Sequence, residues 1–420
     1  MLIELNVLLY GKKVGTLFDD GINISFYYSN SFKLSGLEIS PIKLNTTKIK
    51  GHYSNDDFIE IYNQLPGIFK DSLPDSNGTI IMDNYFRATN RDPSRLSVLE
   101  RLSFIGNRGM GALEYEPKEE HDKKSNIFQY SIDAQELYIR NKQLHQSNKV
   151  LHIDEIMSHM IDSASPVGGA KEKTLVFLNP ISKKLRFYSN NLKFEGFEPY
   201  ILKFDSKDIY KEDTKKEYLY NCLAKLCGID VPDFELLHSD GMSHFLIKRF
   251  DRVGTKKIHM ATASALLHIP HIRSAISYEE LAKLTYTLTK NIEDVKKLIH
   301  QMMFNILTGV TDDHSKNFSF LMDIDGKWSL SPAYDLIYGL GVGALKHKCT
   351  LMGKNENFKI TDVYNLASKY GIANDFIDNR FEKIIQVISE NFENICQKAQ
   401  LSSTTQNGIA MYIEEKINSF

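Results

Sequence analysis

The strongest constraint on the fold of this chain is a change of pattern near residue 252. Before it, short apolar segments at 174–178 and 200–204 predict strands, and a helix is predicted over 219–228, where Gly228 ends it. After it, the helical spacing of apolar residues prevails, apart from one predicted hairpin around Asp325 and Gly326. A small β-rich lobe followed by a larger helical lobe predicts an α+β fold with a ligand cleft between the lobes.

The length of 420 residues exceeds what one simple core accommodates, so we expect two or three subdomains around a shared cleft. Residues 1–125 alternate as strands do, with glycine turns between them, and are predicted to form a first subdomain. The charged segment 114–148 lacks clear periodicity and is predicted to be a linker. Residues 126–250 are then expected to form the β-rich lobe, and residues 251–420 the helical lobe.

The composition narrows the classes of function. The 51 basic and 53 acidic side chains leave a net charge of −2, and the lysine pairs are scattered, which argues against nucleic acid as the main ligand. The four cysteines are too few to indicate a disulfide framework or a zinc site. No apolar run is long enough to span a bilayer, and the N-terminus has no signal-peptide pattern, so we expect a cytoplasmic protein without membrane contact.

The segment 309–320, GVTDDHSKNFSF, carries the strongest local signal. Phosphoryl transfer requires a carboxylate near the attacking hydroxyl, a cation near the transferring phosphate and oxygen ligands for Mg²⁺. Asp312 and Asn317 have the Asp-x4-Asn spacing of kinase catalytic loops, and Lys316 is the cation of the segment. Asp335 offers the second carboxylate that a metal pair requires. The order of base, amide and carboxylate therefore indicates a phosphotransferase that uses ATP and Mg²⁺.

The same residues also have an ordinary structural interpretation, because aspartate is common at helix caps and in turns. In that alternative, Asp312 and Asp313 cap a loop, and Asp335 caps a helix. His314 either orients a phosphate or the loop, or is a structural residue. The upstream segments are needed to decide between the two interpretations.

Upstream, paired glycines and one strand lysine fit a nucleotide site. Gly168 and Gly169 let backbone N–H groups approach phosphate oxygens, although such a pair is also common in ordinary turns. Lys203 lies between apolar neighbours in a predicted strand, and a half-buried lysine requires an anionic partner. That partner is a carboxylate or, in the interpretation we favour, a nucleotide phosphate.

Two further positions near the expected cleft stay open. Glu217 is the natural partner of Lys203 if the helix that follows resembles the regulatory helix of kinases, but Thr214 and Glu217 also have the spacing of a capping box. Lys248 and Phe250 end a strand where the two lobes are expected to join. Backbone groups there either hold adenine or form a simple hinge.

Taken together, these motifs resemble the HipA family of serine/threonine kinase toxins over the full length of the chain. The resemblance rests on TDDHSKNFS and SPAYDLI near the C-terminus, and on GGAKEK, YILKF and IKRFDR in the middle. The N-terminal motifs KKVGTL, LPDS and GNRGMGAL are similar to the accessory subdomain of the full-length toxins. The resemblance implies a two-lobed protein-kinase-like fold, with the accessory subdomain at 1–125, the kinase N-lobe at 126–250 and the helical C-lobe at 251–420.

The resemblance also implies a role for each matched residue. Asp312 corresponds to the catalytic base, Asn317 and Asp335 to the magnesium ligands, and Lys203 to the lysine that binds the ATP phosphates. A mobile phosphate-binding loop of the family corresponds to Gly168, Gly169 and Lys173.

The implied partners are a HipB-type helix-turn-helix antitoxin, which carries the DNA contacts, and a protein substrate. In characterised relatives that substrate is an aminoacyl-tRNA synthetase, but no feature of this sequence identifies it. A small-molecule phosphotransferase of kinase-like fold is the alternative enzyme. A catalytically silent scaffold or corepressor bound to the antitoxin is the alternative without catalysis, and the retained lysine, aspartates and asparagine argue against it.

Two positions depart from the family pattern. The loop serine that relatives autophosphorylate aligns with Pro166, so autophosphorylation is expected at Ser165 or Ser163 instead, and the proline biases Ser165 towards an extended backbone. Asp313 stands where the family usually has glycine, and it is expected to add a charge next to the site.

Overall fold

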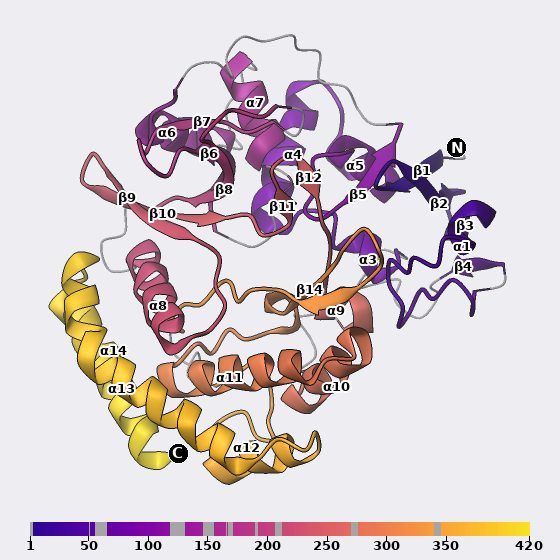
Figure 1. Cartoon of the computed structure of the whole chain (residues 1–420). Helices are drawn as coiled ribbons and strands as arrows, with labels where there is room; N and C mark the ends of the chain where they lie inside the picture. The colour runs from indigo at the N-terminus through magenta and orange to yellow at the C-terminus, as the bar shows by residue number, and fades with distance from the viewer. Residues whose placement is uncertain are drawn as a thin grey trace.

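A computed structural model describes residues 3–49, 51–54, 65–117, 131–145, 155–164, 166, 171–189, 192–205, 212–269, 276–339 and 346–420. Ser165, Gly168 and Gly169 lie outside the described residues. The N-terminal sheet lies beside a β-rich lobe, and the helical lobe lies below both in the view of Figure 1. The α+β class expected from the sequence is confirmed.

The N-terminal sheet has the strand order β4-β3-β2-β1-β5, with all neighbours antiparallel. Its strands are β1 (Ile3–Leu9), β2 (Lys12–Asp19), β3 (Ile24–Tyr28), β4 (His52–Ser54) and β5 (Leu113–Glu116). The accompanying helices are α1 (Asn30–Lys33), α3 (Gly67–Lys70), α4 (Ser76–Ala88), a 3-10 turn η2 (Pro93–Arg95) and α5 (Val98–Ile105). The linker predicted from residue 114 is wrong at its start, because residues 114–116 pair with β1.

The sheet of the β-rich lobe has the order β7-β6-β8-β10-β9. Its strands are β6 (Lys173–Leu178), β7 (Leu185–Phe187), β8 (Glu198–Lys203), β9 (Phe234–Ser239) and β10 (Met242–Lys248), and its helices are α6 (Ala134–Leu144), α7 (Glu155–Ala164) and α8 (Asp213–Cys227). The predicted linker is also wrong near its end, where α6 packs on α7. The strands expected at 174–178 and 200–204 and the helix that ends at Gly228 are confirmed.

The core of this lobe includes side chains from the N-terminal segment. Ile81 and Phe86 of α4 and Phe104 of α5 are fully buried in one cluster with Met160 of α7 and Leu202 of β8. The N-terminal segment, which carries α4 and α5, is therefore joined to the β-rich lobe through a shared hydrophobic core.

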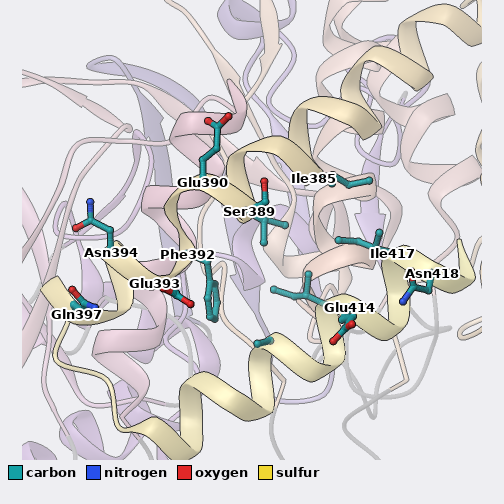
Figure 2. Close-up of a pocket in the computed structure, with 13 residues that line it drawn as sticks. Ile385, Ser389, Glu390, Phe392, Glu393, Asn394, Gln397, Glu414, Ile417 and Asn418 are labelled. Carbon is teal, nitrogen blue, oxygen red and sulfur yellow. The ribbon is translucent and has the colours of Figure 1, made fainter.

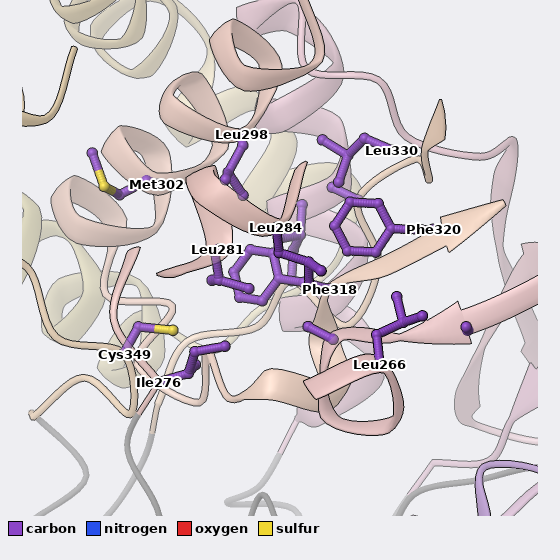
Figure 3. Close-up of a cluster of buried hydrophobic side chains, with 14 of the residues drawn as sticks. Leu266, Ile276, Leu281, Leu284, Leu298, Met302, Phe318, Phe320, Leu330 and Cys349 are labelled. Atoms are coloured by element: carbon purple, nitrogen blue, oxygen red, sulfur yellow. The ribbon is translucent and has the colours of Figure 1, made fainter. Parts of the chain in front are cut away.

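The helical lobe contains the predicted hairpin, β14 (Ser319–Met322) and β15 (Trp328–Leu330), but β13 (His259–Thr262) extends it into a sheet that the sequence did not indicate. Leu281, Leu298 and Phe320 are among the side chains that fill the core under this sheet (Figure 3). The remaining elements are β11 (Arg252–Val253), β12 (Lys256–Lys257), α9 (Ala263–Leu267), α10 (Tyr278–Thr289), α11 (Ile292–Thr308), a 3-10 turn η4 (Ser315–Asn317), α12 (Ile360–Ser368), α13 (Asn374–Lys398) and α14 (Ser403–Ser419).

A groove of about 540 Å³ separates α13 from α14 on the surface of the helical lobe (Figure 2). Ile385, Phe392 and Ile417 contribute apolar side chains to it, and Glu390 and Glu414 contribute carboxylates. The candidate catalytic and nucleotide-binding residues are not among its lining residues. Across the described part of the chain, no helix is both long and apolar enough to cross a membrane.

Candidate functional site

A buried charge cluster forms where β8 ends and α8 begins. Lys203 forms ion pairs with Glu217 of α8 and with Asp335 of the helical lobe. The side chains of Lys203 and Glu217 are only 7% and 3% exposed, whereas that of Asp335 is 38% exposed. In this structure the anionic partners of Lys203 are thus carboxylates, contributed by two different lobes.

The position of the helix start decides the role of Glu217. Helix α8 begins at Asp213, so Glu217 lies in its second turn, and the alternative in which Glu217 forms a capping box with Thr214 is wrong. The Thr214 hydroxyl instead donates to the carbonyl of Ser243, 2.6 Å away. Glu217 is free to face the sheet, and it holds Lys203.

The electrostatics of the cluster favour its ionised lysine. Burial alone lowers the pKa of Lys203, but the carboxylates of Asp335 and Glu217 outweigh it and raise that pKa above its ordinary value. Burial raises the pKa of Glu217. Desolvation opposes the ionisation of Asp335, yet the ammonium groups of Lys203 and Lys173 hold its pKa well below the usual range. The cluster can therefore bind a charged ligand without first changing the charge of Lys203 or Asp335.

Lys173 is the second lysine of this charge cluster. It lies opposite Lys203 in the antiparallel pair β6–β8, so both side chains project from the same face of the sheet. Burial lowers the pKa of Lys173 to about 8, against the attraction of Asp335. The lysine that the family resemblance assigned to the phosphate loop thus faces the same charges as Lys203.

Asp335 belongs to a segment without regular secondary structure. Residues 331–339 contain no helix, so the alternative in which Asp335 caps one is wrong. Its backbone has a positive φ of 54°. The hydroxyl of the preceding residue, Tyr334, donates to the carbonyl of Lys316 at 2.6 Å and lies 2.5 Å from the Ser319 hydroxyl. Tyr334, which the sequence did not single out, therefore ties Asp335 to the loop that carries Asp312.

This candidate catalytic loop, residues 311–317, follows the end of α11 at Gly309, which has a φ of 78°. A Cβ on Gly309 would meet the rings of Tyr412 and Tyr338 at 2.7 and 2.8 Å, so glycine is required by both conformation and space. The side chain of Asp312 is 61% exposed, and His314 Nε2 lies 3.9 Å from its carboxylate. The loop thus presents an accessible carboxylate.

The side chain of Asn317 closes the loop. Its Nδ2 donates to the carbonyl of Asp312 at 2.8 Å, which leaves Oδ1 as the atom suited to a cation. His314 accepts a hydrogen bond from the backbone N–H of Lys316 at 3.2 Å, so its observed contacts stabilise the loop. Within the described part of the chain, Asp312 accepts a hydrogen bond through its backbone carbonyl and none through its carboxylate. The alternative in which the Asp312 side chain caps the loop is therefore not seen.

Asp313 has the opposite environment from Asp312. Its carboxylate is fully buried and accepts hydrogen bonds from the Tyr278 hydroxyl (2.6 Å), the ring of His347 (2.7 Å) and the backbone N–H groups of Lys348 (2.8 Å) and Cys349 (3.0 Å). The expectation that Asp313 adds a charge next to the site is wrong, because these four groups hold it inside the helical lobe. Sequence reasoning did not identify this anchor.

Lys316 is held from the N-terminal segment. Its ammonium forms an ion pair with Asp75, the N-cap residue of α4, and their side chains are 18% and 26% exposed. The sequence predicted a phosphate-facing cation at Lys316 but no partner for it. Asp75 lies within LPDS, a motif quoted only for its resemblance to the accessory subdomain.

The strand end at Lys248 and Phe250 lies between the two lobes. Lys248 pairs with Glu198 at 2.7 Å and lies 3.7 Å from Asp233. The ring of Phe250 packs against Tyr334, with 5.5 Å between ring centroids. Phe250 thus contacts the residue next to Asp335, which is consistent with a connection between the two lobes. Adenine binding at this strand end stays a prediction.

The two candidate phosphoacceptors differ in what the structure describes. Ser163 lies in α7 with 1% exposure, and its hydroxyl is 2.8 Å from that of Thr174. As placed, Ser163 is inaccessible to a kinase site, which argues against it as the phosphoacceptor in this conformation. Ser165 lies outside the described residues.

The residues present fit a magnesium ion held together with nucleotide phosphates. Among the described residues, no three His, Cys, Asp or Glu side chains converge to hold a metal. A kinase site needs fewer, because Mg²⁺ is bound by one or two protein oxygens and by the phosphates. The carboxylate of Asp335, which is ionised and partly exposed, and the Oδ1 atom of Asn317 are the oxygens suited to this role.

Comparisons with known proteins found matches over most of the chain. A family model described as the HipA-like C-terminal domain matches residues 165–395, and one described as the HipA N-terminal domain matches residues 5–116. A solved complex of HipA, HipB and operator DNA from Shewanella oneidensis contains a chain with a TM-score of 0.69 and 17% identity, covering 99% of this chain and 96% of that one. This likeness establishes the two-lobed, kinase-like fold.

Curated relatives match over a shorter stretch. The serine/threonine-protein kinase toxin HipA of Shewanella oneidensis is 25% identical over 193 residues, which are 41% of this chain and 42% of that protein. The putative kinase Y4dM of Sinorhizobium fredii is 27% identical over 197 residues, 40% and 48% of the two chains. The matched stretch thus spans less than half the length of either relative.

Proposed function

The chain belongs to the HipA family, and from this premise we propose that it is an ATP-dependent serine/threonine protein kinase that acts as the toxin of a toxin-antitoxin pair. One observation carries the proposal. The buried ion pair of Lys203 with Glu217 meets Asp335 in one charge cluster, and Tyr334 connects that cluster to the loop of Asp312 and Asn317. A lysine–glutamate pair and a metal-binding aspartate in place together are what kinase chemistry demands.

In the proposed reaction the substrate hydroxyl oxygen forms a bond to the γ-phosphorus of ATP, and the bond from that phosphorus to the leaving oxygen of ADP breaks. Asp312, exposed at the mouth of the loop, accepts the proton of the hydroxyl. Lys203, fixed by Glu217, holds the nucleotide phosphates, and Lys173 adds a second charge beside it. Mg²⁺, held by Asn317 and Asp335, would neutralise the charge that develops on the phosphates.

The toxin and its partner are inferred from the relatives. One relative is named as a kinase toxin, and the structural neighbour assembles with HipB and operator DNA. We propose a HipB-type helix-turn-helix antitoxin as partner, with DNA contacts residing in it, because this chain has a net charge of −2. The proposed substrate is a cytoplasmic component of translation such as an aminoacyl-tRNA synthetase.

The test is phosphoproteomics after induced expression, comparing the wild type with Asp312→Asn. The proposal expects new phosphoserine or phosphothreonine sites on a host protein, absent with the variant. Turnover of ATP with small alcohols and no new phosphoprotein would favour the small-molecule phosphotransferase. No turnover, together with a stable antitoxin complex, would favour the silent scaffold.

Autophosphorylation belongs to the same proposal. A phosphate on Ser165 would add about 1.5 to 2 negative charges beside the ATP phosphates and expel the loop from the cleft. Intact-mass analysis of wild-type protein with Mg-ATP should show a phosphate adduct that the Ser165→Ala variant lacks. Loss of the adduct only in Ser163→Ala would require α7 to open and would reverse the assignment.

A further inference from the structure

The N-terminal segment reaches the catalytic loop through one side chain. Asp75 forms an ion pair with Lys316, the residue beside Asn317, although the two positions are 241 residues apart in the chain. Both side chains are largely shielded from solvent, at 26% and 18% exposed. Such a contact is weakly screened by salt and fixes the direction of a long, flexible lysine.

The position of Asp75 in its helix shows that this contact is tertiary rather than local. An aspartate at an N-cap ordinarily accepts a hydrogen bond from the backbone N–H of the first helical turn. Asp92 and Asp133, at two other N-caps of the chain, do so. Asp75 makes no side-chain capping bond to α4, and its carboxylate is directed to Lys316.

The approach of Asp75 is built into the packing of the N-terminal segment on α9. A Cβ on Gly67 would meet the carbonyl of Ala265 at 2.5 Å, so this close contact requires glycine. The carboxylate of Asp71 accepts hydrogen bonds from the backbone N–H (2.8 Å) and the hydroxyl (2.9 Å) of Thr262, the N-cap of α9. The contacts of Gly67 and Asp71 thus fix the backbone that precedes Asp75 against α9.

Helix α9 connects this contact to the catalytic loop. Its first residue, Ala263, donates to the carbonyl of Phe318 at 2.8 Å, next to Asn317. The backbone of Lys316 is held independently, at its carbonyl by Tyr334 and at its N–H by His314. With the backbone fixed, the direction of the ammonium is set by what its side chain contacts. Among the described residues its ion-pair partner is Asp75, and the buried carboxylate of Asp71 also attracts it.

The electrostatic neighbours of Asp75 include lysines from different parts of the molecule. Asp75 attracts Lys173 of β6 and Lys70 of α3 as well as Lys316. Lysines from the β-rich lobe and from the catalytic loop therefore face the same carboxylate. An ammonium has three donors, so Lys316 can keep Asp75 and still donate to phosphate oxygens.

We propose that Asp75 is a positioning residue of the kinase site, which directs Lys316 towards the transferring phosphate, so that the N-terminal domain completes the catalytic centre. This inference rests on the proposed function. A preset ammonium removes the reorganisation that a mobile lysine would undergo during each transfer.

The contact itself is tested by the reactivity of Lys316, which needs no kinase activity. Acetic anhydride is applied briefly to the full-length chain, and acetylation at Lys316 is measured by mass spectrometry. Asp75→Asn, which keeps a good N-cap residue, should acetylate at Lys316 at least about fivefold faster than the wild type, because a lost ion pair frees the amine. Asp83→Asn is the matched control, since it breaks an ion pair of the same helix with Arg101 and leaves Lys316 unchanged. Equal Lys316 reactivity in the wild type and Asp75→Asn would overturn the proposal.

The catalytic role is tested by a double-mutant cycle. Asp75→Asn should lower kcat about 10- to 100-fold with little change in KM for ATP, and in the Lys316→Gln background it should have no further effect. Additive losses would mean that Asp75 acts other than through Lys316, and a higher kcat would mean that it restrains the enzyme; either result overturns the proposal. If the wild type transfers no phosphate at all, the proposed function fails with it, and the labelling result still identifies whether the contact exists.

Discussion

The catalytic loop and the lysine cluster hold their charges by opposite means. In the loop, the carboxylate of Asp312 is 61% exposed. The loop is held in place by the buried Asp313, which accepts hydrogen bonds from inside the helical lobe. In the cluster, Lys203 and Glu217 are themselves buried and fix each other. In the proposed mechanism, the group that exchanges a proton with a substrate stays accessible. The groups that would hold charged phosphates are desolvated, where electrostatic contacts are stronger.

The first prediction tests the exposed side of this comparison and has the largest effect. Asp312→Asn should reduce phosphotransfer by about 10³-fold or more, because the proton acceptor is lost. Its thermal unfolding should match the wild type, since the side chain is exposed and its carbonyl still accepts from Asn317. A variant that retains near wild-type rates would remove Asp312 from the mechanism.

The adjacent residue should behave in the reverse manner. Asp313→Ala should lower the free energy of unfolding by about 3 kcal/mol, because four donors, three of them buried, lose their acceptor. Urea denaturation measures this value, and Lys348→Ala is a suitable control because only the backbone N–H of Lys348 contacts Asp313. If Asp313→Ala were as stable as the wild type, the loop would not depend on this anchor.

A third prediction concerns the point where the two regions meet. Asp335→Asn should weaken Mg²⁺ affinity by about 10- to 100-fold, because an ionised oxygen ligand is lost. The measurement is the rise in unfolding temperature that ATP produces as Mg²⁺ is titrated. A titration identical to that of the wild type would place the metal elsewhere.

The smallest predicted effect follows from the pKa of Lys173, which burial lowers to about 8. The lysine is charged below that pH and neutral above it, so ATP affinity should fall about tenfold between pH 7 and pH 9. The charged groups that act on Lys173 include Asp335, Lys203, Glu217 and Asp75. Calorimetric titration should show no such fall in Lys173→Met, and an equal fall in that variant would assign the pH dependence to another group.

Much of the site was predictable because its motifs are local. The spacing of Asp312 and Asn317, the strand of Lys203 and the helix that ends at Gly228 all follow from neighbouring residues. The linker was predicted wrongly because charged, aperiodic residues also occur in β5 and α6, where packing overrides composition. The capping box failed for a related reason, since α8 begins before Thr214.

The sequence by itself indicated the class of chemistry that we propose: two aspartates, an asparagine and a strand lysine in a given order, on a β-rich lobe followed by a helical one. Only the tertiary structure decided which carboxylate faces solvent, which one is an anchor, and which residue holds each lysine. Asp312 and Asp313 are identical and adjacent, so no local pattern separates them. Asp75 and Lys316 lie 241 residues apart. Their contact depends on how the N-terminal segment packs on α9, and the free energy of that packing comes from surfaces that are adjacent only in the folded chain.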